Sequence, residues 1–343
     1  MDTAPVISTV DVSLDRDWIA RYEKWCTKVY HDRATDTPTA VQRVVLLTMH
    51  YRIVKEQYDI SGERVPENIW QEKPADIKID RPLLRLVHGL PGSGKSRLLL
   101  WLKSYFEEVW QWNIDNQFAI TAPLNSMAAN IGGGTLHSFG AIPFKDRTGA
   151  WINSLGGGDE DKDTLVRKKW ANLRVVLVDE IEAVSVEMIG KIEHSMRQHI
   201  PTTESVCEGL KRVQHSQRIR DVAFAGVNIL FFGDFWQLDP PGGKSFMSNP
   251  CDTNGDSLVD LTLMMFWLPA KTSPEDVSEV PESSTAKDNE ALESFHLQAW
   301  NDKARVLELS QNIRSGDDKW FSDVLDQCRL GQLSEQNYNF LHG

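Results

Sequence analysis

A single lysine stands among three glycines in the stretch GLPGSGKS at residues 89–96, which directly follows the apolar run LLRLVH. Glycine adopts backbone angles that other residues avoid, so successive N–H groups in such a stretch can converge on one anion. The spacing G-x-x-x-x-G-K-S is that of a phosphate-binding loop, in which Lys95 reaches the β- and γ-phosphates and the Ser96 hydroxyl coordinates Mg²⁺. We therefore expect a nucleoside triphosphate to contact Gly89, Gly92, Ser93, Gly94, Lys95 and Ser96.

The residues on either side of this loop distinguish a phosphate site from an ordinary glycine-rich turn. An apolar strand leads into the loop. The stretch KSRLLLWLKSYFEEVW leads out of it, with Leu98, Leu102, Phe106 and Val109 at helical spacing. A strand, a glycine-rich loop and a helix in this order favour the phosphate site.

Two acidic residues, Asp179 and Glu180, follow a second apolar run, VVLV. Asp179 would hold Mg²⁺ through water, since this ion keeps much of its hydration shell. Glu180 would orient or deprotonate the attacking water. The alternative is an acidic start to a helix, which the helix dipole favours. Because a phosphate loop lies upstream, we favour the roles in metal binding and hydrolysis.

A third apolar run ends in FFGDFWQLDPP at residues 231–241. Gln237 can donate and accept hydrogen bonds, so it could sense a γ-phosphate, although a solvated glutamine in a surface turn is the alternative. We expect Trp236 in the core, whereas an exposed tryptophan could stack on nucleic-acid bases.

The composition of the 343 residues, with 41% hydrophobic and 25% charged, is that of an ordinary soluble globular protein. No apolar run reaches the ~18 residues of a membrane span, and the N-terminus lacks the features of a signal peptide. The four cysteines show no metal-ligand spacing, which indicates reduced intracellular thiols. The net charge of −12 argues against unspecific coating of nucleic acid, but it allows a local basic groove.

Helical patterns cover residues 14–30 and 39–60, and strand patterns recur near residue 82 and at 118–123, 174–180 and 227–234. Strands that alternate with helices predict an α/β fold with a parallel sheet covered on both faces. We expect four parts: an N-terminal helical region (1–80), a P-loop ATPase domain (81–268), a flexible linker rich in Pro, Ser and acidic residues (269–290) and new structure (291–343).

Together these segments resemble the Pif-one-type DNA helicases, the RecD-like branch of helicase superfamily one. GLPGSGKS, VDEIEAVS and FFGDFWQLDP are similar to the family's first three motifs. TAPLNSMAANIGGGTLHSFGAI (121–142) resembles a stretch that touches single-stranded DNA, and LELSQNIRSGDDKWFSDVLDQCRLGQLS (307–334) resembles the fourth motif. The resemblance covers about residues 82–343, in the family's order.

The resemblance implies a RecA-like fold for residues 81–268, the start of a second RecA-like domain at 291–343, and ATP and Mg²⁺ as cofactors. It implies γ-phosphate sensing by Gln237 and by Arg314, whose planar guanidinium suits a developing phosphoryl charge. The implied catalytic set is Lys95, Glu180, Gln237 and Arg314.

The resemblance also implies contacts to the DNA backbone and to adenine. The DNA candidates are Thr121, His137 and Ser138, because short polar groups fix register on phosphates without reading bases. An ordinary packed histidine is the alternative for His137. Gln42, in TAVQRVVLL, is the candidate for the family's adenine contact, although it lies far from Gly89 in sequence.

The chain departs from the family pattern in three places. LNSMAAN stands where Thr-Gly-x-Ala-Ala is common, and Glu182 and Ala183 stand where Ser-Met is usual, which adds an acid near the metal site. The fifth and sixth motifs are absent. We therefore expect the front part of a helicase, from a fragment or an incomplete gene model.

The resemblance implies an ATP-dependent DNA helicase that moves from five-prime to three-prime on single-stranded DNA and opens forked duplex DNA. It suggests an intracellular protein of the nucleus, or of the mitochondrion, in repair, recombination or telomere maintenance. We expect no membrane partner, and the oligomeric state does not follow from the sequence. Two alternatives stay open: a switch ATPase without unwinding activity, and a degenerate nucleotide-binding module. A small-molecule kinase would leave TLHS and the third motif unexplained.

Overall fold

The computed structural model describes most of the chain. The described residues are 15–31, 37–71, 73–74, 79, 82–142, 144–145, 151–152, 162–200, 223–241, 243–246, 305–311, 313 and 318–342. The linker expected at 269–290 lies outside them.

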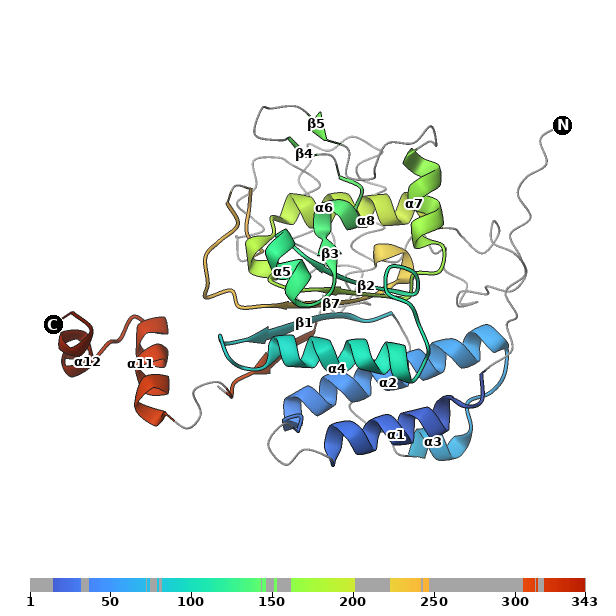
Figure 1. Ribbon diagram of the computed structural model, residues 1–343, viewed down its shortest axis with the longest axis horizontal. Coiled ribbons are helices and arrows are strands. Elements are labelled where there is room, and N and C mark those ends of the chain that lie inside the picture. The colour runs from blue at the N-terminus through green and yellow to red at the C-terminus, as the bar shows by residue number, and fades with distance from the viewer. Residues whose placement is uncertain are drawn as a thin grey trace, which may run out of the picture.

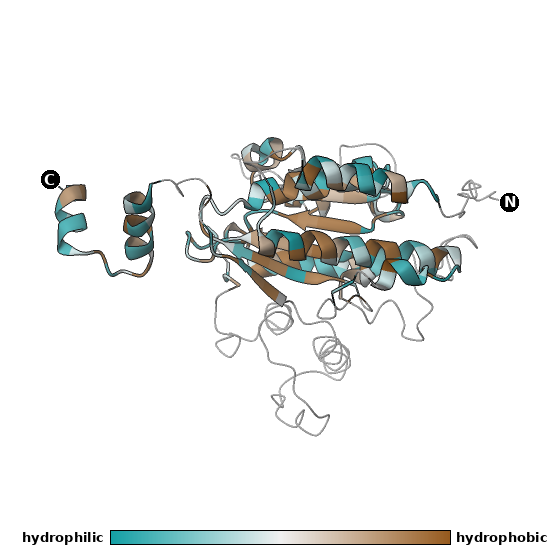
Figure 2. Cartoon of the chain, turned by 90° about the horizontal axis from the view of Figure 1, so that it is seen from below, coloured by the Kyte–Doolittle hydropathy of each residue, from teal (hydrophilic) through white to brown (hydrophobic). Residues whose placement is uncertain are grey.

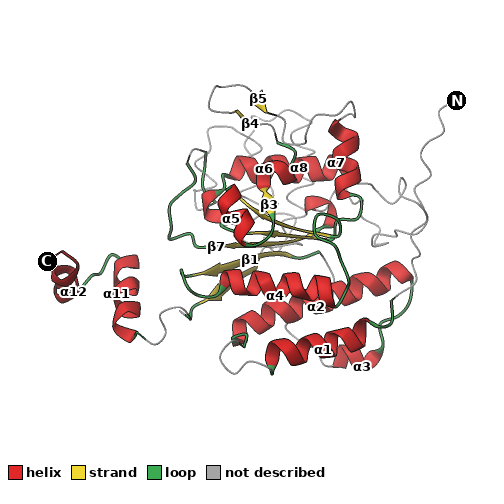
Figure 3. Ribbon diagram, in the orientation of Figure 1, coloured by secondary structure: helices red, strands yellow, loops and turns green. Residues whose placement is uncertain are grey.

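The centre of the fold is a six-stranded sheet in the order β3-β2-β6-β7-β1-β8, in which all paired strands run parallel (Figures 1 and 3). The strands predicted near 82, at 118–123, at 174–180 and at 227–234 are confirmed as β1, β2, β6 and β7. The bounds are β1 (Leu84–Gly89), β2 (Phe118–Ala122), β3 (Gly134–Thr135), β6 (Val175–Val178), β7 (Asn228–Gly233) and β8 (Arg305–Leu309). A separate antiparallel pair joins β4 (Phe144–Lys145) to β5 (Trp151–Ile152).

Helices cover both faces of the sheet (Figure 1), and the strands are mainly hydrophobic (Figure 2). In β7, Leu230 and Phe232 join the core cluster that α1, α2 and α4 complete, whereas Ile229 and Phe231 join the one that α7 and α8 complete. This alternation explains why buried parallel strands read as continuous apolar runs. The helices are α1 (Trp18–Tyr30), α2 (Ala40–Ser61), α3 (Glu67–Gln71), α4 (Lys95–Glu108), α5 (Asn125–Asn130), α6 (Leu136–Phe139), α7 (Lys162–Trp170) and α8 (Val186–His199).

The N-terminal helices belong to the same hydrophobic core as the sheet. Trp18, Trp25 and Met49 are buried in one cluster with Leu177 and Leu230 of the central strands. The helices predicted at 14–30 and 39–60 are thereby confirmed as α1 and α2. No helix in the described part of the chain is long and apolar enough to cross a membrane.

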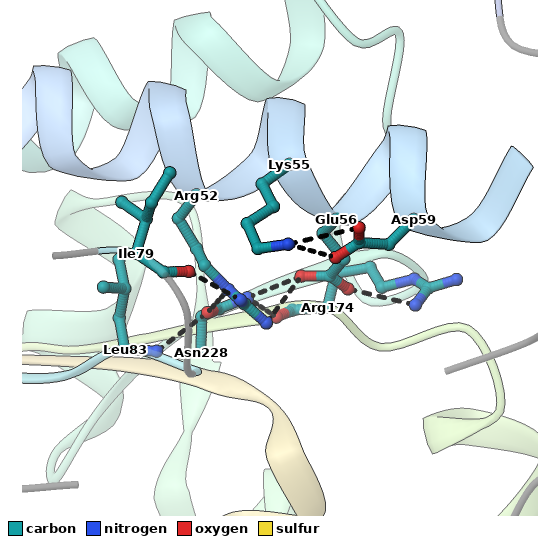
Figure 4. Close-up of polar contacts among 8 residues, drawn as sticks. All are labelled: Arg52, Lys55, Glu56, Asp59, Ile79, Leu83, Arg174 and Asn228. Atoms are coloured by element: carbon teal, nitrogen blue, oxygen red, sulfur yellow. Dashed lines mark hydrogen bonds and ion pairs between the residues drawn. The ribbon is translucent and has the colours of Figure 1, made fainter. Parts of the chain in front are cut away.

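A buried polar network fixes α2 to the strand starts (Figure 4), whereas the phosphate loop follows a strand end. Asn228, at the start of β7, accepts hydrogen bonds from Arg52 Nε (3.1 Å) and from the backbone N–H of Leu83 (2.9 Å). Its amide donates to Glu56 Oε2 (3.0 Å), and Arg174 Nη1 donates to Glu56 Oε1 (3.0 Å). Such groups are costly to bury unless they are paired, and here each one has a partner.

The strand β8 corrects one expected domain boundary. The family resemblance implies that residues 291–343 begin a second domain, but Arg305–Leu309 pair in parallel with β1, from Arg85 with Arg305 to Gly89 with Leu309. They therefore form the edge strand of the first sheet. The chain continues into the helices α11 (Lys319–Arg329) and α12 (Glu335–His342).

Candidate nucleotide site

The candidate site lies along the edge of the sheet where the parallel strands end. Gly89 ends β1, Val178 ends β6 and Gly233 ends β7, and these three strands are neighbours. Carboxyl ends of parallel strands meet at one edge, and ligands of open α/β sheets bind there. The phosphate loop, the Asp179–Glu180 pair and the segment after β7 are thus brought together.

The loop between β1 and α4 has the backbone that an anion cradle needs. Gly92 and Gly94 have φ angles of 82° and 87°, in the left-handed region that other residues avoid. Gly94 caps α4, so the positive end of that helix faces the loop. Lys95 is buried, and its ammonium group donates to the carbonyls of Gly89 (2.6 Å) and Leu90 (3.2 Å).

Two serines of the loop have different surroundings. Ser93 is 2% exposed, and its hydroxyl has no hydrogen-bond partner among the described residues. Ser96 is exposed in the first turn of α4. A buried hydroxyl without a partner and an exposed hydroxyl at the same helix start fit a loop that receives a polar ligand.

The acidic pair lies at the end of β6. The backbone N–H of Asp179 donates to the Thr121 carbonyl (2.8 Å), which continues the pairing of β6 with β2 beyond the strand end. Burial and the neighbouring Glu180 carboxylate raise the pKa of Asp179 to about 6, whereas the Lys95 charge lowers it. Lys95 and Asp179 therefore lie within electrostatic reach of each other, although they are 84 positions apart in sequence.

Glu180 has an unusual backbone for its residue type. Its φ of 52° and ψ of 48° lie in the left-handed region, and it caps the 3₁₀ turn η1 (Ile181–Ala183). Strained backbone at a carboxylate is common at functional sites, where the surrounding structure holds the residue in place.

Gln42 lies against the phosphate loop, despite its distance in sequence. Its side chain is fully buried, and Nε2 lies 3.4 Å from the carbonyl oxygens of Ser93 and Gly94. Its Oε1 accepts from the Thr39 N–H (2.8 Å), as part of the capping box that starts α2. Both ends of the amide are thus engaged within the chain, and its proposed contact to adenine would require one end to be released.

The segment after β7 exposes two of the residues singled out from the sequence. Gln237 is exposed, and its N–H donates to the Asp234 carbonyl (2.9 Å). The expectation that Trp236 lies in the core is wrong, since 63% of it is exposed. The turn that begins at Asp234 carries this side chain outward, although the strand before it is buried.

Sequence reasoning missed His88, which precedes the phosphate loop on β1. Its Nε2 accepts from the backbone N–H of Phe235 (3.3 Å), and the two rings stack with centroids 6.0 Å apart. His88 therefore connects the phosphate-loop strand to the segment after β7. A histidine interrupting the apolar run before the loop was the available signal.

The three DNA candidates differ in position. Thr121 is 1% exposed, and its hydroxyl donates to the Leu177 carbonyl (3.3 Å). Its side chain therefore hydrogen-bonds within the sheet, which does not support a contact to the DNA backbone. His137 and Ser138 are half-buried on α6, and the Ser138 N–H donates to Thr135 Oγ1 (3.2 Å). Burial lowers the pKa of His137, which favours the neutral ring.

The candidate sensor Arg314 lies outside the described residues, but its neighbour Ile313 does not. The Ile313 N–H donates to the Gly92 carbonyl (2.9 Å), and its side chain lies beside Gly94. Ile313 itself therefore lies against the phosphate loop.

Glu182 is the residue at this edge that the family pattern does not predict. It lies in η1, is 4% exposed, and neither carboxylate oxygen has a hydrogen-bond partner among the described residues. Burial, followed by the neighbouring Glu180 carboxyl, raises its pKa to about 8.

A parallel sheet with a glycine-rich loop and buried lysine after one strand, and an acidic pair two strands away, defines a P-loop nucleotide-binding protein of the α/β class. The model of the PIF1-like helicase family matches residues 74–246, which is half of the chain. The chain therefore belongs to the PIF1-like helicase family, and the RecA-like fold expected from the sequence is confirmed.

Curated relatives agree with this family. ATP-dependent DNA helicase PIF1 of Saccharomyces cerevisiae is 25% identical over 284 residues, which are 80% of this chain and 24% of that protein. ATP-dependent DNA helicase RRM3 of the same species is 26% identical over 176 residues, or 51% of this chain and 21% of that protein. The chain thus spans about a quarter of the length of the curated relatives that it matches.

Solved structures with similar chains include Pif1 helicase from Candida albicans, with 20% identity and a TM-score of 0.44 over 88% of this chain and 46% of that one. Pif1 helicase from Bacteroides, in complex with ADP-AlF3 and single-stranded DNA, has 20% identity and a TM-score of 0.42 over 80% of this chain and 47% of that one.

Proposed function

We propose that this chain acts as an ATP-dependent DNA helicase, coupling ATP hydrolysis to movement along single-stranded DNA and to opening of a forked duplex. The observation that carries the ATP site is that β1 and β6, which lie on either side of β7 in the parallel sheet, end at one edge and bring the loop with Lys95 and the Asp179–Glu180 pair together there. The names of the curated relatives support the DNA substrate.

The hydrolytic roles follow from the chemistry of each side chain. The ammonium group of Lys95 neutralises charge on the β- and γ-phosphates, for which it must leave the carbonyls of Gly89 and Leu90. Glu180 orients the attacking water and accepts its proton. Gln237 and Arg314 sense the γ-phosphate, so that the state with ATP differs in energy from the state without it.

Magnesium is the metal that this site would take. The described residues contain no group of three or more His, Cys, Asp or Glu side chains arranged to hold a metal ion. Mg²⁺ suits such a site, because it is usually held by one or two carboxylates together with substrate phosphates and waters. Ser96 and Asp179 would hold it, and it would neutralise charge that develops on the phosphates.

The DNA strand would cross the same edge of the sheet, over α6 and the segment after β7. His137 and Ser138 would contact phosphates, and the exposed ring of Trp236 would stack on a base. Movement from five-prime to three-prime, a nuclear or mitochondrial location, and roles in repair, recombination or telomere maintenance stay predictions from the family resemblance.

The test is steady-state ATP hydrolysis by the full chain, with and without single-stranded DNA. Lys95→Ala should lower kcat/KM at least ~100-fold, because a positioned charge on the reacting group is lost. Glu180→Gln should lower kcat by about 100-fold or more while ATP binding persists. The matched controls are Lys24→Ala and Glu107→Gln, which make the same chemical changes at exposed positions on α1 and α4.

The outcomes separate the alternatives. Hydrolysis that DNA does not stimulate would indicate the switch ATPase, and failure to bind ATP with Mg²⁺ would indicate the degenerate module. Wild-type turnover in Lys95→Ala or Glu180→Gln would show that the assigned residues do not carry the reaction.

A further inference from the structure

His88 is a polar residue near the end of an apolar strand, and the reaction described above gives it no role. The pairing of β1 with β7 places His88 opposite Gly233, the last residue of β7. Its ring therefore lies where the chain leaves β7 and turns at Asp234. The His88 side chain is 12% exposed and that of Asp234 is 2% exposed, so this junction is largely shielded from water.

One ring nitrogen of His88 reaches two groups of this turn. Nε2 lies 3.3 Å from the backbone nitrogen of Phe235 and 3.4 Å from Asp234 Oδ1. A neutral ring with its proton on Nδ1 accepts from the Phe235 N–H, and a protonated ring would donate to the Asp234 carboxylate. The ring also stacks on Phe235, with an angle of 7° between the two planes. In either protonation state, His88 ties β1 to the turn.

Asp234 connects this contact to the candidate γ-phosphate sensor. Its Oδ1 accepts from the Trp236 N–H (3.1 Å), and its carbonyl accepts from the Gln237 N–H (2.9 Å). The backbone that carries the Gln237 side chain is therefore bonded to a residue that His88 contacts. A displacement of the His88 ring would change the place of this backbone.

On its other side, His88 continues directly into the phosphate loop. The carbonyl of the next residue, Gly89, accepts from the Lys95 ammonium group (2.6 Å). A Cβ on Gly89 would collide with Ser93 Oγ, so the strand end and the loop are in close contact. His88 thus lies between two segments that must both reach one triphosphate.

We propose that His88 is a positioning residue that holds the Asp234–Gln237 turn at a fixed place relative to the phosphate loop, so that Gln237 can reach the γ-phosphate of bound ATP. This inference rests on the proposed function of the site. His88 itself needs no contact with the nucleotide. Its loss would weaken recognition of the γ-phosphate, whereas ADP, which has no γ-phosphate, would bind as before.

Two variants separate the contributions of the ring. His88→Phe keeps a flat ring for Phe235 but removes Nε2, whereas His88→Gln keeps a terminal group that can accept and donate hydrogen bonds. The matched controls are His31→Phe and His31→Gln, which make the same changes at an exposed position that ends α1. His88→Leu, which also lacks the acceptor, replaces His88→Phe if that variant does not fold.

Isothermal titration calorimetry of the full chain measures the affinities for ADP and for the non-hydrolysable β,γ-imido analogue of ATP, both with Mg²⁺. We expect His88→Phe to weaken binding of the analogue about 3- to 10-fold, because a hydrogen bond to the γ-phosphate is lost, and to leave the ADP affinity within about twofold. We expect His88→Gln to stay within about twofold of wild type for both nucleotides. A purely structural role would change both affinities or neither.

Steady-state ATP hydrolysis tests whether His88 acts through Gln237. We expect His88→Phe to lower kcat/KM about 10-fold, because the sensor is misplaced. In a chain that already carries Gln237→Ala, the same change should cost less than about twofold, because residues that act as a unit have non-additive effects.

Each outcome either supports or overturns the inference. Wild-type analogue affinity and kcat/KM in His88→Phe would overturn it, as would equal losses of analogue and ADP affinity or an additive loss in the double variant. Equal losses in the Phe and Gln variants would also overturn it, since the hydrogen bond would then not matter. A wild-type chain that binds both nucleotides without hydrolysis would refute the proposed function, while the two affinities would still decide the role of His88. A wild-type chain that binds neither nucleotide would overturn both.

Discussion

Glu56→Gln should be among the most destabilising single changes in this chain, although glutamine has nearly the same shape. Glu56 is 6% exposed and is the carboxylate of the network that joins α2 to the strand starts (Figure 4). It accepts from Arg174 (3.0 Å) and Asn228 (3.0 Å), and Arg52 Nη2 lies 3.8 Å from it. With glutamine at this position, the buried guanidinium group of Arg174 would lose the carboxylate with which it pairs.

The size of the expected stability loss in Glu56→Gln follows from the burial of the ion pair. Removing one partner of a buried ion pair typically costs 3–5 kcal/mol, because the remaining charge stays desolvated. The matched control is Asp59→Asn, three positions further along α2. Asp59 pairs with Lys55 (3.0 Å) in a partly exposed i,i+4 contact, for which we expect a loss of about 0.5 kcal/mol.

Urea unfolding followed by far-UV circular dichroism measures the free energy of unfolding of each variant relative to wild type, provided that the m-value is unchanged. The difference between the two variants should be roughly 3 kcal/mol or more. If Glu56→Gln cost no more than Asp59→Asn, the network would not fix α2 to the sheet.

Two further predictions concern pH and DNA. Burial lowers the pKa of His50 to about 3, so the stability due to its neutral ring is complete above its ordinary pKa of about 6.5 and is lost as the pH falls towards 3. Wild type should lose about 2 kcal/mol of this stability between pH 7.5 and pH 5, and His50→Gln should not. Urea unfolding at both pH values measures this, and an equal loss of unfolding free energy in the two proteins would contradict the prediction. Trp236→Ala should weaken binding of single-stranded DNA by about 5- to 100-fold without changing Tm, because one base-stacking contact is lost; fluorescence-anisotropy binding that matches wild type would place the strand elsewhere.

The parts of the fold that could be predicted from sequence are those in which a local pattern has one physical cause. Buried parallel strands need continuous apolar runs, and β2, β6 and β7 were located from such runs. The phosphate loop needs left-handed backbone at particular positions, and Gly92 and Gly94 supply it. Acidic residues directly after a strand indicate the ligand edge of the sheet, and Asp179 lies there.

The parts that could not be predicted depend on contacts between distant segments. Nothing local in Arg305–Leu309 specifies β1 as its partner, because a parallel edge strand can join any free edge of matching length. Thr121 looks like an accessible hydroxyl after an apolar run, but β6 extends beside it and buries it. Trp236 depends on the direction of a turn, which hydrophobicity does not encode.

The helix α2 shows most clearly why the sequence does not reveal that the N-terminal helices share a core with the sheet. It buries Arg52 and Glu56 as well as apolar residues, so its apolar residues do not form a single stripe. Its two ends have different tasks: the Glu56 network fixes the helix to the strand starts, and Gln42, 14 positions away, contacts the phosphate loop. At 1.5 Å per residue these contacts lie ~21 Å apart along one rigid element. The placement of Gln42 against the loop therefore depends on buried charges at the opposite edge of the sheet. The helix α2 thus packs as part of the domain that contains the phosphate loop.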